Sequence, residues 1–220
     1  MRNFVYTEKP ENLPEGKVSW ESPSNIALVK YWGKKREQLP ANPSLSFTLN
    51  NCKTTTTLTY SKSDQLTFEV FVDGKREESF EPKIKTFFER ISEYCSFINQ
   101  YQFKIETSNS FPHSSGIASS ASGLSALALC ICTIEKSINT QFTNVDFINK
   151  ASFLARLGSG SACRSLFPLL ASWGKHEHIV SSSNFIGTKY EDIHPVFKTY
   201  QDTILLVDKG QKKVSSTVGH

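Results

Sequence analysis

The longest apolar pattern in the sequence, Ile117–Ile138, constrains the fold more than any other feature. Four apolar residues recur in it at helical intervals, with alanines between them: Leu124, Leu127, Ala128 and Ile131. This spacing predicts one long helix. The stretch Phe111–Gly123 that leads into it is rich in Ser and Gly, and Tyr101–Glu106 alternates as a strand does. A loop of small residues therefore joins a strand to the N-terminus of the long helix.

The chain before this helix predicts a β-sheet. The candidate strands are rich in Thr, Leu and aromatic residues: Lys17–Trp20, Asn25–Trp32, Leu45–Leu49, Thr54–Tyr60 and Leu66–Val72. Ser22–Ser24 predicts a break between the first two strands, and Asp73-Gly74 predicts a tight hairpin turn. Pro82–Ile98 changes to helical spacing, because its apolar residues share one face of a helix.

The chain after the long helix predicts two further helices and a strand. Thr143–Leu157 has helical spacing, with Thr143 or Asn144 as its N-cap and Gly158 at its end. Ser161–Phe167 predicts a short helix, and the apolar Thr203–Val207 predicts a final strand. Because strands come first and helices later, this order predicts an α+β fold rather than a regularly alternating doubly wound sheet.

Charge and composition narrow the class of ligand. The formal net charge of +4 suits an anionic small molecule, and no Lys/Arg cluster is longer than Lys34–Arg36, so we expect no nucleic acid partner. The five cysteines match no zinc or disulfide spacing, which predicts free thiols in a reducing cytoplasm. Met1–Lys17 has no apolar core, and no apolar run approaches the roughly 20 residues of a membrane span. We therefore expect neither a signal peptide nor a membrane partner.

The loop Phe111–Gly123 is the strongest candidate for a phosphate site. Small residues let a ligand approach the backbone, and free N–H groups at a helix N-terminus favour phosphate oxygens, as does the helix dipole. Ser119 and Ser120 add hydroxyl groups, one of which also suits a Mg²⁺ ion. A Ser-rich helix cap is the alternative. No basic residue lies in the loop, so it is not a P-loop of the G-x-x-x-x-G-K-[ST] type.

The segment Gly158–Ser165 is a second candidate. Ser159 and Ser161 offer hydroxyl groups at a new helix N-terminus. Arg164 offers a planar fork that suits a carboxylate or a phosphate. A helix–helix turn with a surface Arg is the alternative.

The segment Asn25–Lys34 is a third candidate. On a strand, Lys30 and Lys34 share one face, which suits a diphosphate, while Tyr31 points to the other face unless the strand bends at Gly33. Solvated lysines beside a core strand are the alternative.

Other chemistries have little support in the sequence. No G-x-S-x-G string is present. His176-Glu177-His178 lacks the i, i+4 spacing of a zinc helix. We expect no activation of Ser114 by its sequence neighbour His113, because adjacent residues rarely reach that geometry.

Together these segments resemble diphosphomevalonate decarboxylases, a family of the GHMP kinase superfamily. The resemblance spans residues 17 to 219, and the matching segments follow the family's order: Asn25–Lys34, Leu39–Ser46, Phe111–Gly123, Gly158–Ser165 and Val214–Gly219. The strings N-I-A-x-x-K-Y-W-G-K and G-S-G-S-A-C-R-S are specific. The serine loop alone indicates only the superfamily.

The resemblance implies a two-domain α+β enzyme with a cleft between its domains. The first domain would have the GHMP kinase-like fold, which is shared with a ribosomal-protein domain, and the second a ferredoxin-like fold. The implied reaction is the decarboxylation of mevalonate 5-diphosphate to isopentenyl diphosphate with ATP and Mg²⁺, which yields ADP, phosphate and CO₂. ATP would first phosphorylate the tertiary hydroxyl group, and loss of that phosphate would drive decarboxylation. A homodimer is compatible with this resemblance.

The resemblance also implies roles for individual residues. Arg164, Lys30 and Ser216 would act in catalysis. The substrate would contact Tyr31, Lys34, Ser159, Ser161 and Arg164. ATP would contact Asn109, Pro112, Ser114, Ser115, Gly116, Ala118, Ser119 and Ser120, with Ser120 also a ligand of Mg²⁺.

The sequence departs from the family's pattern in two ways. Nothing matches the Asp-x-Gly-x-Asn-like segment that holds the family's catalytic Asp, and His220 stands where Met is usual. We therefore expect residues 1–199 to form the ATP- and substrate-binding domain and residues 200–220 to begin a truncated C-terminal domain. The catalytic Asp is expected beyond His220, and these residues alone are expected to be inactive.

Two alternatives stay open at this point. A phosphomevalonate decarboxylase or a mevalonate-type kinase would have the same serine loop, although Arg164 favours a carboxylate and the Lys30/Tyr31/Lys34 set favours a diphosphate. A non-catalytic RNA-binding module is disfavoured by the modest charge and by the lack of aromatic and basic stretches.

Overall fold

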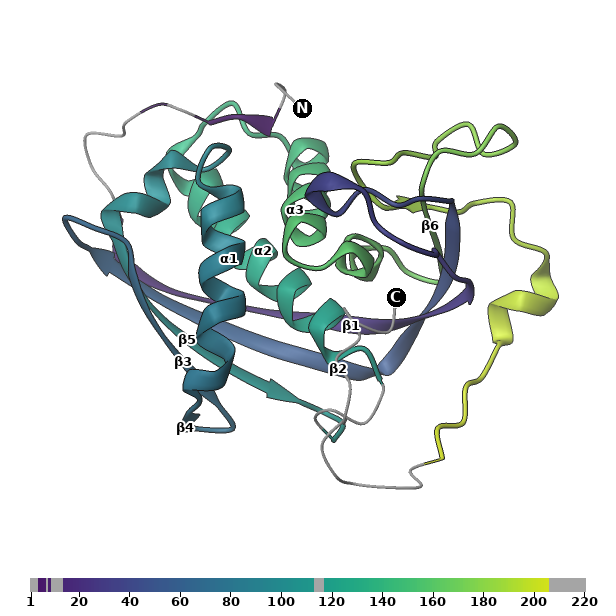
Figure 1. The fold of residues 1–220 in the computed structure, drawn as a ribbon, viewed down its shortest axis with the longest axis horizontal. Coiled ribbons are helices and arrows are strands. Elements are labelled where there is room, and N and C mark those ends of the chain that lie inside the picture. The colour runs from purple at the N-terminus through teal and green to yellow at the C-terminus, as the bar shows by residue number, and fades with distance from the viewer. Residues whose placement is uncertain (1–3, 7, 9–13, 113–116, 206–220) are drawn as a thin grey trace.

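One long, bent strand pair forms the centre of the sheet (Figure 1). The computed structural model describes residues 4–6, 8, 14–112 and 117–205. In it, β1 (Gly16–Val29) runs antiparallel to β2 (Ser44–Lys62). The opposite edge of β2 pairs with β6 (Leu170–Trp173) at one end and with β5 (Tyr101–Asn109) at the other.

The remaining strands extend this sheet beyond β5 and beyond β6. β3 (Thr67–Val72) pairs in parallel with β5, and β4 (Lys75–Arg76) pairs with β3. β7 (Thr188–Lys189) pairs with β6. Within the described residues the order is β4-β3-β5-β2-β6-β7, with β1 on the free side of β2.

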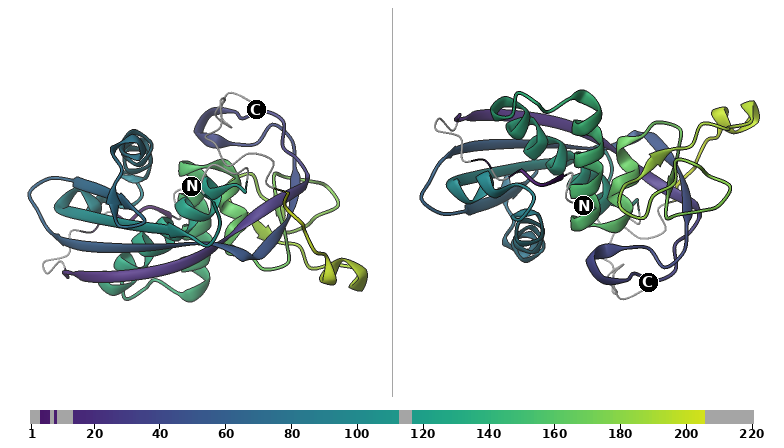
Figure 2. Two further views of the ribbon diagram at one scale, coloured as in Figure 1. Left: turned by 90° about the horizontal axis from the view of Figure 1, so that it is seen from below. Right: turned by 90° about the horizontal axis from the view of Figure 1, so that it is seen from above.

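The three α-helices lie on one face of the sheet (Figures 1 and 2). They are α1 (Glu81–Ile91), α2 (Ser119–Ile138) and α3 (Asn144–Gly158). Short 3₁₀ helices occur at Arg36–Gln38, Glu78–Phe80, Ser96–Gln100, Gly160–Leu166 (η5) and Pro195–Thr199. Along β5, buried Tyr101, Phe103 and Ile105 alternate with exposed Gln102 and Lys104, so one face of the sheet packs on the helices. This is the expected α+β architecture.

Helix α2 is the central core helix. Its residues Ala126, Ala128, Cys130, Ile131 and Cys132 are fully buried. By length and composition alone this helix could cross a membrane, but 72% of its apolar window is buried inside the domain. It is therefore a core helix, as its periodicity predicts.

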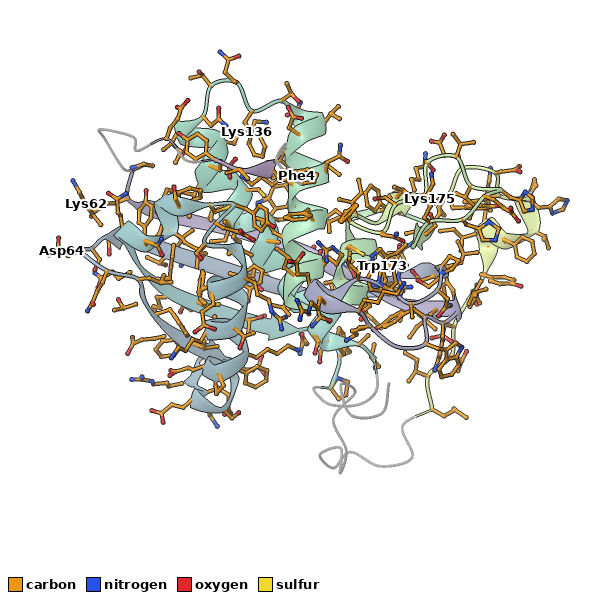
Figure 3. The ribbon with its side chains drawn as sticks, turned by 45° about the horizontal axis from the view of Figure 1, so that its top comes forward. Phe4, Lys62, Asp64, Lys136, Trp173 and Lys175 are labelled. Atoms are coloured by element: carbon orange, nitrogen blue, oxygen red, sulfur yellow. The ribbon has the colours of Figure 1, made fainter. Side chains whose placement is uncertain are left out.

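Aromatic pairs hold α1 and α3 in place. Phe88 of α1 stacks on Phe103 of β5 with ring centroids 5.4 Å apart. Phe153 of α3 stacks on Phe4 with ring centroids 4.7 Å apart, and Figure 3 shows Phe4 lying over this helix. Burial of each such side chain contributes about 1.5–3 kcal/mol. These pairs matter for the site because both helices contribute residues to it.

Local signals for a turn and a helix cap are confirmed. Asp73 and Gly74 have φ of 49° and 78°, as a two-residue hairpin turn requires, and they join paired Val72 and Lys75. The N-cap of α3 is Thr143, whose hydroxyl accepts from the Asp146 N–H while the Asp146 carboxylate accepts from the Thr143 N–H.

The predicted strand break at Ser22–Ser24 is wrong. β1 is continuous through these residues. Its register with β2 shifts between Pro23 and Ser24, and pairing resumes after the shift. The extra residues of β2 bulge there: Asn50, Asn51 and Cys52. The predicted strands Leu45–Leu49 and Thr54–Tyr60 are consequently one bent strand.

Three other predictions need correction. The helix predicted over Pro82–Ile98 ends at Ile91, and the chain then forms a turn and a 3₁₀ helix that still buries Phe97 and Ile98. β6 and β7 were not predicted, because strands of four and two residues are too short to show an alternating pattern. Residues 203–205 are not in a strand, and the rest of the predicted strand Thr203–Val207 lies outside the described residues. All five cysteines are free thiols, as expected.

Candidate functional site

The serine loop ends at the N-terminus of α2. Ser119 and Ser120 are the first residues of the helix, and Ala118 precedes them with a left-handed φ of 55°. The Ser24 hydroxyl of β1 donates to the Ile117 carbonyl and ties this end of the loop to the sheet. The predicted residues Ser114, Ser115 and Gly116, and also His113, lie outside the described residues, as does Ser216.

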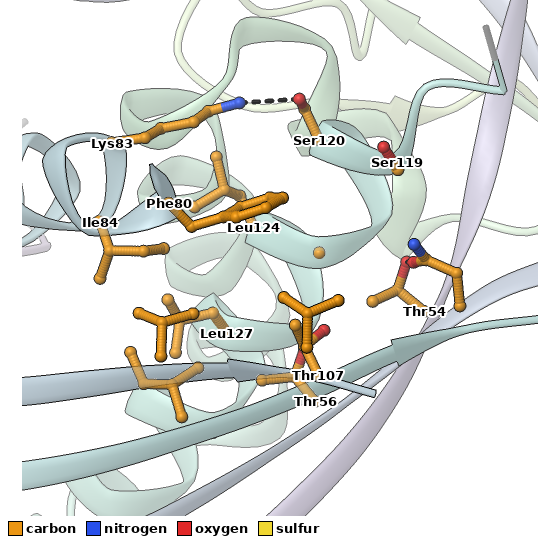
Figure 4. Close-up of a pocket in the computed structure, with 15 residues that line it drawn as sticks. Thr54, Thr56, Phe80, Lys83, Ile84, Thr107, Ser119, Ser120, Leu124 and Leu127 are labelled. Carbon is orange, nitrogen blue, oxygen red and sulfur yellow. Dashed lines mark hydrogen bonds between the residues drawn. The ribbon is translucent and has the colours of Figure 1, made fainter. Parts of the chain in front are cut away.

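A cavity of about 190 Å³ lies between this helix terminus, α1 and the sheet (Figure 4). Its walls are apolar on one side, where Val70, Ile84, Ile105, Leu124 and Leu127 line it. Polar groups line the other side: Thr54, Asn109, Ser119, Ser120 and Lys83. The Thr54 hydroxyl donates to Asn109 Oδ1 over 2.6 Å, so the predicted Asn109 is held beside the two serines.

Lys83 of α1 reaches the serine loop, although the sequence analysis did not select it. Its Nζ donates to Ser120 Oγ over 2.7 Å (Figure 4). Part of the side chain stays exposed, yet desolvation of the ammonium, and secondarily the charge of Lys34, lowers the pKa of Lys83 to about 8. A cation thus faces the hydroxyl group that was predicted to bind ATP and Mg²⁺.

The second predicted loop is fixed by two glycines. A Cβ on Gly158 would lie 2.8 Å from the Phe87 ring, and a Cβ on Gly160 would lie 2.5 Å from the Trp173 ring. Only glycine therefore allows this close approach of the backbone. Ser159, which ends α3, and Ser161 of η5 take their positions from this packing.

Arg164 of η5 is a buried cation, not a surface residue. It is 2% exposed. Its Nε donates to Asn25 Oδ1 over 3.3 Å and its Nη1 to Ser44 Oγ over 2.5 Å. Burial lowers the pKa of its guanidinium, because neither neutral partner supplies a countercharge. The planar group is held rigidly, with donors left for an anionic ligand.

Tyr31 lies beside Arg164. Its ring is buried edge-on against Trp173, with centroids 4.9 Å apart. Arg164 Cζ and Lys34 Nζ each lie 5.8 Å from the Tyr31 ring centroid, and its hydroxyl hydrogen-bonds with Ser161. Burial raises the pKa of the Tyr31 phenol, and the charge of Arg164 opposes this rise. The structure therefore brings together four of the predicted substrate-binding residues.

The two lysines of the Asn25–Lys34 motif differ in their exposure and contacts. β1 ends at Val29, and Gly33 has φ of +85°, so the chain bends as the sequence allowed. Lys30 is exposed, and in the described part of the chain no contact joins its ammonium to Tyr31 or Arg164. The prediction that Lys30 and Lys34 share one face assumed a strand. It does not apply, because β1 ends at Val29, before both lysines.

Lys34 lies on a small hairpin, residues 33–41, closed by two backbone hydrogen bonds. Lys35 N–H donates to the Leu39 carbonyl over 2.7 Å, and Ala41 N–H donates to the Gly33 carbonyl over 3.2 Å. Burial, and secondarily the charge of Arg90, lowers the pKa of Lys34.

Four cations thus converge from three parts of the fold: Lys34, Lys83, Arg90 and Arg164. Among the described residues, none of them forms a salt bridge with a carboxylate. Like charges without counterions repel each other, so this arrangement is suited to a ligand with several negative charges. The same residues include no cluster of three His, Cys, Asp or Glu that could hold a metal ion.

Sequence reasoning missed Asn25, Ser44 and Lys83 as site residues. Asn25 and Ser44 stand inside the selected motifs, but their neutral side chains gave no sign that they would orient Arg164. Asn25 also donates to Ser165 Oγ over 2.7 Å, which holds η5 against β1. Lys83 is one lysine on an amphipathic helix, and nothing in its neighbourhood in the sequence distinguishes it.

The fold and the site define a class: an α+β domain with cations gathered at the ends of two helices, α2 and α3. Comparison with known families is more specific. Residues 22–185 match the family described as diphosphomevalonate decarboxylase-like N-terminal domain. The chain therefore belongs to this family, which confirms the resemblance inferred from the motifs.

Individual relatives agree with this assignment. The diphosphomevalonate decarboxylase of Rattus norvegicus is 31% identical over 97% of this chain and 53% of its own length, and that of Homo sapiens is 30% identical over 94% and 52%. The solved mevalonate diphosphate decarboxylase of Enterococcus faecalis has a TM-score of 0.63 and 34% identity over 80% of this chain and 51% of its own. The chain spans about half the length of the curated relatives it matches.

A further solved structure that is similar to this chain contains bound ligands. It is MDDEF in complex with MVAPP, AMPPCP and magnesium, with a TM-score of 0.61 and 35% identity over 79% of this chain and 49% of its own. That protein therefore binds MVAPP, AMPPCP and magnesium.

Proposed function

We propose that this chain forms the ATP- and substrate-binding part of an ATP-dependent decarboxylase for mevalonate 5-diphosphate. The products would be isopentenyl diphosphate, ADP, phosphate and CO₂. The observation that carries the proposal is the buried Arg164, which has no carboxylate partner among the described residues and lies beside Tyr31 and Lys34. A kinase acting on an alcohol needs a phosphate site, but it does not need a buried guanidinium aimed at a second anionic group.

The nucleotide would occupy the α2 end of the site. Its phosphates would contact the first N–H groups of α2 and the hydroxyl groups of Ser119 and Ser120. The apolar side of the neighbouring cavity, formed in part by Ile84 and Leu124, suits a purine ring. Lys83 would neutralise charge on the phosphates, since its ammonium already lies at Ser120.

Magnesium fits this arrangement as an ion held mainly by phosphates. It prefers oxygen ligands and keeps several waters, and Ser120 Oγ is an oxygen that faces the proposed phosphate position. When bound, the ion would neutralise charge on the transferring phosphoryl group. Asn109, Pro112 and Ala118 would shape the loop around the nucleotide, as would Ser114, Ser115 and Gly116.

The substrate would occupy the other half of the site. Its diphosphate would bind Tyr31, Lys34, Ser159 and Ser161, and its carboxylate would bind Arg164. A rigid bidentate contact holds the carboxylate in line with the breaking bonds, which favours elimination of phosphate together with loss of CO₂. Lys30 and Ser216 remain proposed members of the site, with the catalytic Asp supplied from outside these residues.

Product analysis of the full-length protein tests this proposal. Incubation with ATP, Mg²⁺ and mevalonate 5-diphosphate should release one CO₂ for each ADP formed. A stable phosphorylated product without CO₂ would show a kinase instead. Faster turnover of mevalonate 5-phosphate would show a monophosphate decarboxylase.

The pKa of Lys83 leads to a prediction about pH. Its pKa in the free protein is about 8, and a bound anion favours the charged form and raises that pKa. ATP binding should therefore take up protons near pH 8, and ATP affinity should fall as the pH rises from about 7 to 9.5. Isothermal titration calorimetry in buffers of different ionisation enthalpy measures both quantities.

Matched variants assign this pH dependence to Lys83. Lys83→Gln should lose the part of the dependence centred near pH 8, although Lys34, whose pKa is also lowered, would keep a part. Lys85→Gln removes a charge from an exposed position of the same helix and should leave the dependence unchanged. An unchanged pH profile in the Lys83 variant would argue against a contact between Lys83 and the nucleotide.

We also propose a cytoplasmic location, supported by the five unpaired cysteines. A homodimer and the division at about residue 200 stay predictions. Analytical ultracentrifugation and limited proteolysis test them.

A further inference from the structure

Arg90 is the one cation of the cluster without an assigned role. It lies in the last turn of α1, and its Nη1 donates to the Leu157 carbonyl over 2.7 Å. Leu157 is the penultimate residue of α3 and directly precedes Gly158 and Ser159. The final carbonyls of a helix lack intrahelical donors, so this contact alone fits a helix-end cap.

The surroundings of the guanidinium do not fit a cap alone. α1 and the hairpin of residues 33–41 project from the same side of the molecule, with the end of α3 between them (Figures 1 and 2). Arg90 is near enough to Lys34 for its charge to lower the pKa of the lysine. In the described part of the chain no carboxylate pairs with either group. Two half-buried cations kept close without a counterion lower stability unless an anion joins them.

The guanidinium also has unused capacity for hydrogen bonds. It carries five N–H donors, and in the described residues the Leu157 carbonyl accepts from one of its nitrogens. This contact holds the guanidinium at the end of α3, whose next residues are Gly158 and Ser159. A planar fork of fixed orientation suits a phosphate better than a free lysine does.

We propose that Arg90 determines the preference of this site for a diphosphate over a monophosphate. Resting on the proposed function, this inference places the terminal phosphate of the substrate between Lys34 and Arg90. Tyr31, Ser161 and Lys34 bind the phosphate of either ligand. The guanidinium of Arg90 forms hydrogen bonds only when a second phosphate extends toward α1. Arg90 is then a specificity residue that makes no contact with the carboxylate.

Binding measurements on the full-length protein test this inference. Arg90→Gln should weaken mevalonate 5-diphosphate about tenfold or more, because a hydrogen bond to a charged group is lost, while mevalonate 5-phosphate changes less than about twofold. Arg90→Lys should restore part of the loss, since it keeps the charge and not the fork. Lys85→Gln is the control for loss of one charge from the same helix. A purely structural role predicts equal losses for both ligands and for ATP, with a lower Tm, and that outcome would overturn the proposal.

Two further measurements separate this inference from the proposed function. Pyrophosphate and inorganic phosphate probe the anion site without the mevalonate carbon skeleton. If the wild-type protein prefers pyrophosphate but ignores mevalonate 5-diphosphate, the proposed function fails and Arg90 can still be judged. In the unaltered protein, pyrophosphate should protect Arg90 from phenylglyoxal better than phosphate does. If pyrophosphate and phosphate protect Arg90 from phenylglyoxal equally, Arg90 does not bind the second phosphate. A preference for pyrophosphate that is kept in Arg90→Gln would show the same.

Discussion

Replacing Arg164 by glutamine in the full-length enzyme should reduce CO₂ release by about thirtyfold to several thousandfold. Loss of one partner of a buried, hydrogen-bonded charge contact costs about 2–5 kcal/mol, and each 1.4 kcal/mol is about tenfold in rate. ATP affinity should change by less than about threefold, because the nucleotide is assigned to α2 and Lys83. Steady-state CO₂ release and calorimetry with an ATP analogue measure the two effects.

The structure also predicts how other variants at this position behave. Arg164→Lys should recover little activity, because one ammonium cannot donate to Asn25, Ser44 and a carboxylate in the same plane. Arg36→Gln removes an exposed arginine from the hairpin of residues 33–41 and should keep near-normal turnover. Near-native decarboxylation by the glutamine variant, with an unchanged Tm, would mean that Arg164 does not hold the carboxylate.

Structural features that depend on residues close together in the sequence could be predicted from the sequence. The Asp73-Gly74 turn and the long helix α2 depend on nearby residues and were predicted correctly, and Thr143 is one of the two helix caps that were predicted. The motif strings also predict that Tyr31 and Arg164 belong to one ligand site, and the structure places the two residues in contact; their roles stay predictions. For such features the sequence neighbours are also the physical neighbours.

Features that depend on distant contacts could not be predicted. The register shift that keeps β1 continuous depends on a bulge in β2. The different environments of Lys30 and Lys34 depend on where β1 ends, and pairing with β2 decides that position. Lys83 and Arg90 are unremarkable lysine and arginine residues of one helix until packing of α1 places them at Ser120 and Leu157.

The second large effect concerns stability and a buried ion pair. Glu135 of α2 and Lys150 of α3 are each 2% exposed, and Lys150 Nζ lies 2.6 Å from Glu135 Oε2. Lys150 Nζ also donates to the Tyr94 carbonyl over 2.8 Å, and Cys95 Sγ lies 3.6 Å from the same carboxylate. The pair joins the two helices that carry the serine loop and the Gly158–Ser165 loop.

Lys150→Met should lower the free energy of unfolding by about 3–5 kcal/mol, because it leaves the Glu135 carboxylate buried without its cation. This is a large share of the roughly 5–15 kcal/mol that stabilises a typical domain. The exposed pair of Lys104 and Glu106, 2.9 Å apart, is the control, and Lys104→Met should cost less than about 1 kcal/mol. Urea unfolding at neutral pH, followed by circular dichroism, measures both variants.

Two measurements show whether the lost charge of Lys150 or its lost packing lowers the free energy of unfolding. One is the dependence of that free energy on pH below 7, and the other is the stability of a double variant. Burial raises the pKa of Glu135, and Lys150 opposes this, so without Lys150 the pKa should lie higher still. A protein in which folding raises the pKa of a carboxyl group becomes less stable as the pH rises. The free energy of unfolding of Lys150→Met should therefore increase relative to that of the wild type as the pH falls from 7 toward 5. Glu135→Met combined with Lys150→Met should recover most of the loss, because no charge is then left buried, and the Tyr94 carbonyl still accepts from the Tyr6 N–H over 3.0 Å. If the double variant is as unstable as Lys150→Met and neither responds to pH, the methylene packing of Lys150, and not the ion pair, joins α2 to α3.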